Sequence, residues 1–185
     1  MRVYSSPKPF PHILIHGFLQ KKEYAAVDHA LQKEKFSLKN SDLFQFQQTA
    51  DLRTAEQETL RTFQKWLSSQ HALIFSVTKK KTKGQVDAFG SLYSDTDYLL
   101  PHDDRLESRK VAFILYFSTL SRKNGGALCL YSSHGRPTKP TATTRRYQPK
   151  ENLLVLFPVT RTSWHSVSEV VGNVKRYAIG GWFRG

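Results

Sequence analysis

The sequence has very little cysteine and no long apolar run. Its single cysteine, Cys129, excludes an internal disulfide and a zinc site built from several cysteines, and it favours a reducing compartment. No stretch is apolar enough to span a bilayer, and residues 1–18 lack the apolar core of a signal peptide. We therefore expect a soluble intracellular protein, cytoplasmic, nuclear or both, with no membrane partner.

Acidic residues are also scarce relative to basic ones. The 185 residues include 28 lysines and arginines against 15 acids, which gives a net charge of +13. Much of the excess lies in two segments, residues 79–83 and residues 132–150, and the second contains no acid. Such a field attracts polyanions, although basic runs are also common in solvated turns and loops. The charge predicts an environment near nucleic acid and no particular activity.

The rest of the composition is that of a globular domain. Apolar residues make up 39% of the chain and aromatic residues 12%, which excludes a disordered protein. A chain of this length is expected to form one domain, residues 1–185, with its own core. In the first half, apolar residues recur at helical spacing over residues 20–34 and 54–70. Thr54 followed by Gln57 predicts a capping box at the start of the second helix.

After Gly84 the pattern changes to short runs rich in β-branched and aromatic residues. These runs predict strands over residues 86–93, 111–117, 127–131, 153–157, 164–171 and 175–183. The basic segment 132–150 is interpreted as a long surface loop. Helices followed by many short strands predict an α+β fold that is mainly β, either a sandwich or a barrel with helices packed on one face.

Residues 101–107, PHDDRLE, place metal-binding side chains just before the apolar strand at 111–117. Residues i and i+2 of an extended segment point to the same side, so His102 and Asp104 should converge while Asp103 points away. His165, on a later predicted strand, would complete a set of two histidines and one carboxylate, which suits non-haem Fe(II). Zinc accepts the same ligands, so a hydrolytic metal site stays open, as does a purely structural role for His165.

Arg176 adds a second chemical feature. An inward-facing guanidinium on this strand would need a buried anionic partner, and arginine is suited to a bidentate grip on a carboxylate. The ordinary alternative is a surface charge like that of Lys175. The segments HDD, WHSVSEV and KRYAIGGWFRG, in this order, are more specific than any one of them alone.

The chain resembles the Fe(II)- and 2-oxoglutarate-dependent oxygenases and, among them, the ribosomal prolyl hydroxylases. The segments that carry the resemblance are PFPHILIHGFL, SDLFQFQQTADL, YLLPHDDRLESRKVAFILYF, NGGALCLYS and WHSVSEVVGNVKRYAIGGWFRG. It implies a double-stranded β-helix (a jelly roll, cupin-like), with helical support over about residues 18–80 and a jelly-roll core over about residues 84–185.

The resemblance also implies roles for six side chains. The ligands of the iron would be His102, Asp104 and His165. Arg176 and Tyr116 would bind the distal carboxylate of 2-oxoglutarate, and Tyr93 would line the same pocket. The implied reaction consumes O₂ and 2-oxoglutarate, with ascorbate as the expected reductant. No acid–base residue is needed beyond the metal centre.

The known target of this group is a proline in a small-subunit ribosomal protein at the decoding centre, hydroxylated on carbon 3. A basic enzyme suits proximity to rRNA through its basic segments. A ribosomal protein is itself basic, so acids at the mouth of the site (Asp95, Asp97 and Glu107) would be needed to attract it.

Two alternatives to a prolyl hydroxylase stay open. The basic segments favour a nucleic-acid-directed oxygenase on the same scaffold. The other is a non-catalytic module that binds RNA or ribosomes and keeps only the jelly-roll shell.

Eukaryotic members of the family usually carry a second, non-catalytic β-helix domain that these 185 residues do not include. Segments 118–124 and 132–150 look unlike the family, so we expect specificity to differ there.

Overall fold

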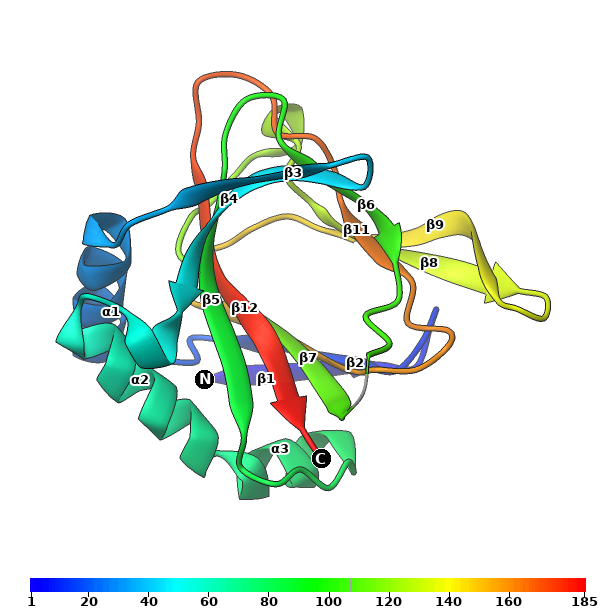
Figure 1. Ribbon diagram of the computed structural model, residues 1–185. Helices are drawn as coiled ribbons and strands as arrows, with labels where there is room; N and C mark the ends of the chain where they lie inside the picture. The colour runs from blue at the N-terminus through cyan, green and yellow to red at the C-terminus, as the bar shows by residue number, and fades with distance from the viewer. Residues whose placement is uncertain (107) are drawn as a thin grey trace.

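The protein folds mainly into antiparallel β-structure, as a computed structural model that describes residues 1–106 and 108–185 shows (Figure 1). The strands are β1 (Arg2–Ser6), β2 (His12–His16), β3 (Ser37–Ser41), β4 (Phe44–Asp51), β5 (Val86–Tyr93), β6 (Tyr98–His102), β7 (Arg109–Tyr116), β8 (Leu128–His134), β9 (Lys139–Tyr147), β10 (Leu153–Pro158), β11 (His165–Val167) and β12 (Arg176–Arg184). The helices are α1 (Lys21–Lys33), α2 (Glu58–Ser69) and α3 (His71–Thr78), with single 3-10 turns at Leu52–Thr54 and Arg122–Asn124.

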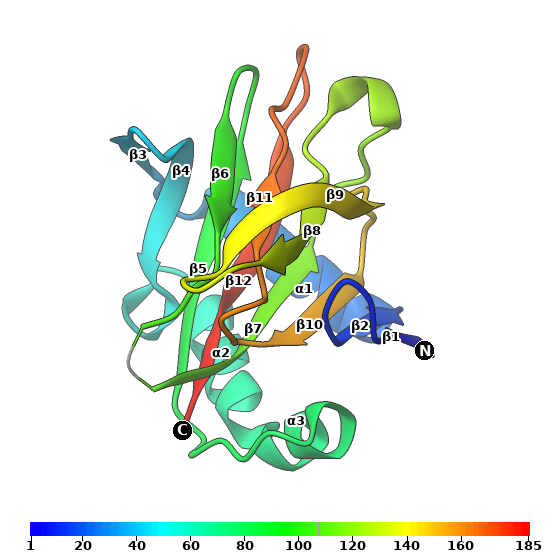
Figure 2. The same ribbon diagram turned by 90° about the vertical axis from the view of Figure 1, so that its right-hand side faces the viewer.

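The strands form two facing sheets joined through β4. The major sheet has the order β1-β2-β10-β7-β12-β5, and the path continues through β4 into the minor sheet β6-β11-β8-β9. All of these pairings are antiparallel, and β3 pairs with β4 at the junction. Figures 1 and 2 show the two sheets enclosing a common interior, which is the jelly roll that the resemblance implied.

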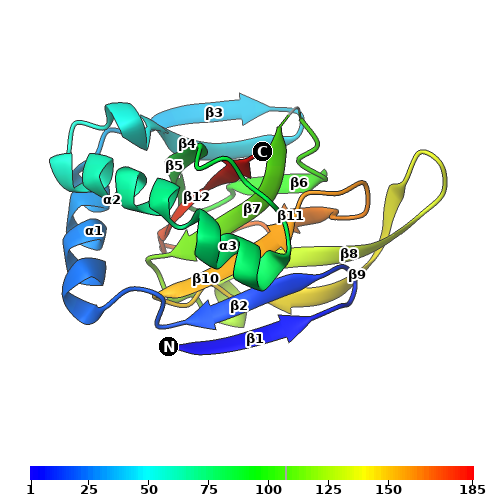
Figure 3. The same cartoon turned by 90° about the horizontal axis from the view of Figure 1, so that it is seen from below.

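Strand β7 separates two hydrophobic clusters because successive side chains of a strand point to opposite faces. Val111, Phe113 and Leu115 pack toward the helices, whereas Ala112 and Tyr116 pack into the interior between the sheets. The strand reads as a continuous apolar run because both of its faces are covered. Figure 3 shows the helices lying across the outer face of the major sheet.

Each of the two longer helices buries one apolar stripe against that sheet. Val27 and Leu31 of α1 and Leu60 and Phe63 of α2 belong to the same cluster as the outer side chains of β7. A capping box begins α1, in which the Glu23 side chain accepts a hydrogen bond from the backbone of Gln20.

The start predicted for the second helix was wrong. The helix α2 begins at Glu58 with Gln57 as its N-cap residue, and Thr54 lies in the preceding 3-10 turn. The Thr54 hydroxyl donates a hydrogen bond to the backbone oxygen of Asp51, so it is unavailable for a capping box. None of the helices within the described residues has both the length and the hydropathy needed to cross a membrane.

The strands predicted from apolar runs are confirmed to within a few residues, except the one over residues 164–171, where β11 covers only His165–Val167. The interpretation of residues 132–150 as a loop was wrong, because β9 pairs with β8 to form a long hairpin. The first half was also less helical than expected, since β1 to β4 lie within it. Strands β1 and β3 were missed because they are polar and exposed and carry little of the alternation that indicates a strand, whereas the apolar residues of β2 (HILIH) and β4 (FQFQQTAD) were overlooked.

Candidate active site

The structure brings the three predicted metal ligands together at the end of the minor sheet. His102 ends β6 and His165 begins β11, and the two residues pair directly in the sheet register. The Asp104 carboxylate lies between them, with its Oδ1 3.4 Å from His102 Nε2 and its Oδ2 3.3 Å from His165 Nε2. Ligand atoms of the three residues all lie within 4.8 Å of one another. This is the donor set of a facial triad.

Asp104 reaches this position by a different route from the one predicted. Strand β6 ends at His102, and Asp104 adopts a left-handed backbone with φ of 61°, which Asp tolerates better than most residues. The turn, rather than an extended i/i+2 relation, aims the carboxylate at the two histidines. Asp103 points away as expected, with its carboxylate 2.7 Å from the Arg105 guanidinium.

Backbone hydrogen bonds orient both imidazoles. His102 Nδ1–H donates to the Leu100 carbonyl at 2.9 Å, and His165 Nδ1–H donates to the Ser163 carbonyl at 2.8 Å. In each imidazole Nε2 is therefore the nitrogen that faces the centre, and it can bind a metal when it carries no proton.

The electrostatics of the cluster also suit a cation. Burial opposes the charged form of His102 and lowers its pKa, but the hydrogen bond and charge of Asp104 outweigh burial and raise the pKa above its usual value. Burial likewise opposes ionisation of Asp104, yet the charge of His165 and its hydrogen bonds with the two histidines hold its pKa well below the usual range. The aspartate is therefore a ready anionic ligand, and a metal ion would displace a proton from His102.

Arg176 is a fully buried cation on β12, with 1% of its surface exposed. Its Nε–H donates to the Gly126 carbonyl at 2.8 Å, and its Nη2 lies 3.5 Å from the Tyr116 hydroxyl. Within the described part of the chain, no carboxylate lies within ion-pair distance of the guanidinium. An unpaired buried charge is costly, so this arrangement fits a ligand that brings its own carboxylate.

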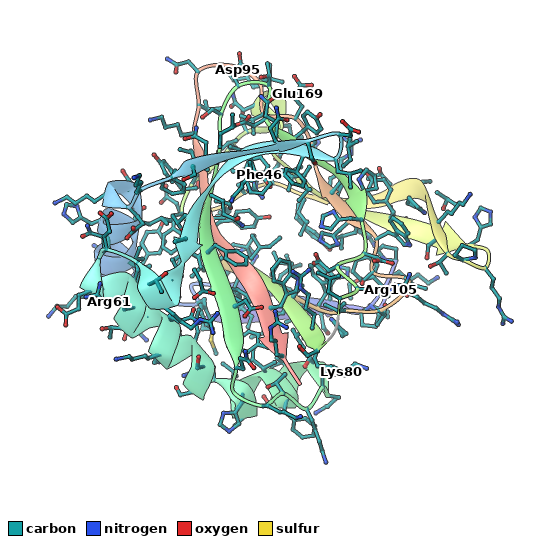
Figure 4. All side chains as sticks on the ribbon, in the orientation of Figure 1. Phe46, Arg61, Lys80, Asp95, Arg105 and Glu169 are labelled. Atoms are coloured by element: carbon teal, nitrogen blue, oxygen red, sulfur yellow. The ribbon has the colours of Figure 1, made fainter. Side chains whose placement is uncertain are left out.

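Aromatic side chains form the walls around this guanidinium. Its central carbon lies 4.7 Å from the Tyr93 ring centroid and 5.0 Å from that of Tyr116. Burial raises the pKa of both phenols, although the charge of Arg176 opposes the rise, so both hydroxyls stay protonated near neutral pH. Phe46 of β4 stacks on Tyr93 with ring centroids 4.8 Å apart, and Figure 4 labels it above the open interior.

One cavity contains both chemical features. It has a volume of about 120 Å³, and its lining includes His102, Asp104 and His165 as well as Tyr93 and Arg176. A larger hollow of about 420 Å³ lies between α1 and α2, on the other face of the major sheet, and its lining includes neither histidine nor arginine. A metal site beside a buried, unpaired guanidinium fits Fe(II) together with a dicarboxylate.

Two further residues of the site were not predicted from the sequence. The Arg109 guanidinium lies 3.3 Å above the Trp182 ring centroid, and its Nη1 is 3.7 Å from Asp104 Oδ1. Trp182 lines the same cavity as Arg176. The signal for Trp182 was present, because it is six residues from Arg176 on one strand and therefore on the same face. Nothing in the sequence indicates that Arg109 belongs to the site, because it cannot be distinguished from the many other basic residues of the chain.

Neither Asp95 nor Asp97, two of the acids expected at the mouth, lines the cavity of the metal centre. Asp97 is buried, and its carboxylate accepts hydrogen bonds from the Ser94 backbone and the Gln45 side chain. Asp95 accepts a hydrogen bond from the backbone of Gly172, and Figure 4 places it beside Glu169 at the far edge of the fold. The prediction is wrong for Asp97, whose burial withholds it from a substrate, and Glu107 lies outside the described residues.

Comparison with known proteins identifies the class to which this site belongs. The sequence matches the 2OG-Fe(II) oxygenase superfamily over residues 88–184, more than half of the chain and all of β7 to β12. The chain therefore belongs to the 2-oxoglutarate- and Fe(II)-dependent oxygenases. All six predicted side chains lie within that match.

The names of curated relatives give a more specific activity than the family match does. The chain is 36% identical over 188 residues to prolyl 3-hydroxylase OGFOD1 of Xenopus laevis, covering 96% of this chain and 35% of that protein. It is 34% identical over 188 residues to prolyl 3-hydroxylase sudestada1 of Drosophila melanogaster, covering 96% of this chain and 35% of that protein. The chain thus spans about a third of the length of these relatives.

Solved structures share the fold at lower identity. A Pseudomonas putida prolyl-4-hydroxylase superposes with a TM-score of 0.72 at 17% identity, over 94% of this chain and 91% of that one. A Trichoplax adhaerens prolyl hydroxylase, solved in complex with a hypoxia inducible factor peptide, gives a TM-score of 0.71 at 20% identity, over 94% of this chain and 83% of that one. These likenesses establish the jelly-roll fold.

Proposed function

We propose that this chain is the catalytic domain of a prolyl hydroxylase that uses Fe(II) and 2-oxoglutarate, with His102, Asp104 and His165 as the iron ligands. The observation that carries the proposal is the shared cavity, in which the two-histidine, one-carboxylate cluster and an unpaired buried arginine face one space. A hydrolytic zinc site has no use for that arginine, whereas a dicarboxylate cosubstrate does.

The residues of the chain would bind and orient the cosubstrate. Arg176 and the Tyr116 hydroxyl would hold the distal carboxylate of 2-oxoglutarate, and Tyr93 would close the pocket over its carbon chain. When bound, Fe(II) and 2-oxoglutarate supply the oxidation of a substrate carbon by O₂, with succinate and CO₂ as co-products. The aromatic walls exclude water from the space where that oxidation occurs. Ascorbate would keep the iron reduced.

The proposed substrate is a proline in a loop of a small-subunit ribosomal protein near the decoding centre, hydroxylated on carbon 3. The names of the curated relatives support prolyl 3-hydroxylation, since each of the two described above is a prolyl 3-hydroxylase. Such a substrate would place the enzyme in the cytoplasm, the nucleus or both. Trp182, which lines the cavity, and Arg109, which lies over the Trp182 ring, would contact the substrate chain.

Mass spectrometry tests this proposal directly. A proline-containing peptide from the decoding-centre loop is incubated with the protein, Fe(II), 2-oxoglutarate and ascorbate in air, with a proline-to-alanine peptide as the control. We expect a gain of one oxygen on the proline and none on the control peptide. Succinate formation without a modified peptide would contradict the substrate, and no succinate at all would contradict the reaction.

A nucleic-acid-directed oxygenase is the second candidate, favoured by the basic β8–β9 hairpin. It predicts succinate formation stimulated by RNA and a gain of one oxygen on a nucleotide. A base would have to leave its stack and enter the same cavity as the cosubstrate. A purely binding module is the third candidate, and it predicts neither succinate nor a spectroscopic signature with Fe(II).

A further inference from the structure

The hairpin formed by β8 and β9 extends beyond the packed core. The first three residues of β8, Leu128 to Leu130, are buried between the sheets, whereas no side chain from Tyr131 to Thr144 is buried. Figures 1 and 3 show this part of the hairpin standing out from the barrel. Two-stranded ribbons without a core have marginal stability, so an exposed arm of this kind needs a reason.

The arm carries exposed cations on both of its faces. Arg136 and Lys139 lie in the protruding part, whereas Arg145 and Arg146 lie at its base, opposite Leu130 and Cys129; all four are exposed, and no acid occurs between residues 132 and 150. Arg145 and Arg146 are neighbours on β9 and therefore point to opposite faces of the ribbon, and Arg146 lines a hollow together with Tyr131.

We propose that the β8–β9 hairpin is an RNA-binding arm that contacts phosphate groups. Cations on both faces of a narrow ribbon suit insertion between two phosphate backbones, as in a groove or junction of folded RNA. The hydroxyls of Ser132, Thr141 and Thr144 are bonded within the hairpin, Ser132 to Thr144 and Thr141 to the Ser132 carbonyl, so they hold its two strands together and leave phosphate binding to the cations. An acidic protein partner fits less well, since the charges are dispersed around the arm rather than gathered on one surface.

The arm is also connected to the metal centre. The Thr138 hydroxyl at its tip hydrogen-bonds the backbone oxygen of Arg161, an exposed cation on the loop before β11. In the same loop, the Ser163 hydroxyl lies 3.4 Å from the backbone oxygen of Asp103, the neighbour of Asp104. RNA held by the arm would therefore lie beside the entrance to the cavity. If the proposed function holds, the arm would position a proline within a ribonucleoprotein, while RNA binding itself does not depend on that reaction.

Fluorescence anisotropy with a labelled RNA stem-loop, measured over a series of salt concentrations, tests the arm. The hairpin variant replaces three exposed cations by glutamine: Arg136→Gln, Lys139→Gln and Arg146→Gln. Losing three phosphate contacts should weaken binding at least about tenfold and reduce the slope of log K against log[salt] by about 2. Circular dichroism should show an unchanged fold, because these three side chains are exposed.

The matched control removes the same charge elsewhere. It replaces three lysines of the 79–83 run, Lys80→Gln, Lys81→Gln and Lys83→Gln, which lie after α3 on a different side of the fold, where Figure 4 labels Lys80. Both variants have a net charge of +10, which is +13 less 3. We expect the control to bind RNA within about twofold of the native protein.

Three results would overturn the proposal. Equal losses in both variants would mean that only net charge attracts RNA. Full binding by the hairpin variant, together with new self-association, would mean that the cations serve to protect the edge strand β9 from pairing with another chain. Displacement of RNA by polyglutamate at equal charge concentration would identify an acidic protein as the better partner.

Discussion

Replacing Arg176 by methionine should strongly weaken 2-oxoglutarate binding while leaving the fold intact. The side chain is buried, and among the described residues its guanidinium has no carboxylate partner. Methionine has a similar length and no charge. The prediction therefore separates two roles that a buried arginine can have, because a structural ion pair would be needed for folding and a ligand site would not.

The structure sets the expected magnitudes. A hydrogen bond to a charged group contributes about 1.5–3 kcal/mol, so losing the bidentate grip on a carboxylate should weaken 2-oxoglutarate binding by more than about 100-fold. For stability, the lost bond from Arg176 to the Gly126 carbonyl costs about 1 kcal/mol, and removal of an unpaired buried charge offsets it. The melting temperature should therefore change by no more than about 4 °C.

Thermal unfolding with Mn(II) in place of iron measures both quantities. At a concentration of 100 times its Kd, 2-oxoglutarate should stabilise the native protein by about 2.7 kcal/mol, or about 5–10 °C for a chain of this size. Arg176→Met should show no such shift, whereas the exposed neighbour variant Lys175→Met should show the full shift. A drop of more than about 10 °C without ligand, or a shift retained in Arg176→Met, would refute the reasoning.

Three further predictions concern the same cavity. Asp104→Asn should weaken Mn(II) binding more than about 100-fold by titration calorimetry while the fold persists, because Asn also tolerates positive φ; unchanged affinity would exclude Asp104 as a ligand. Gly126 has a φ of 66°, and a Cβ added there would lie 3.1 Å from Arg176 Cδ. Gly126→Ala should therefore cost about 1–2 kcal/mol of stability and raise the KM for 2-oxoglutarate. An unchanged KM would contradict the contact between residue 126 and Arg176. Mn(II) affinity should fall as the pH drops, and the fall should start above pH 6.5. The raised pKa of His102 means that protons compete with the metal at a higher pH than they would at an ordinary histidine. A fall that starts only below pH 6.5 would contradict His102 as the competing group.

Much of the core was predictable from the sequence, because a strand that is buried on both faces has a continuous run of apolar residues. Strand β5 matches its predicted bounds, and β7, β10 and β12 differ from theirs by one or two residues at one or both ends. Most of the strands that were missed have polar or mixed patterns, and pairing with a neighbouring strand places them in the sheet. Strand β9, KPTATTRRY, gives no local signal, and its pairing with β8 alone defines it.

In the candidate site, too, some features were predictable from the sequence and others were not. Residue types and order predicted the convergence of His102, Asp104 and His165, but the left-handed turn at Asp104 was not predictable from an extended i/i+2 pattern. The hydrogen bond of Arg176 to Gly126 joins residues 50 positions apart and depends on the whole jelly roll. Asp97 was misplaced because the sequence does not indicate which acids the backbone of a tight turn will bury.

The most direct test of the central claim is the absorption spectrum of the protein with Fe(II) and 2-oxoglutarate under anaerobic conditions. Chelation of the iron by the keto acid should produce a visible charge-transfer band in the native protein. The band should be lost in His102→Ala, which removes a ligand, and should require far more 2-oxoglutarate in Arg176→Met. A native protein that binds Fe(II) and 2-oxoglutarate but shows no band would contradict a shared iron and 2-oxoglutarate centre.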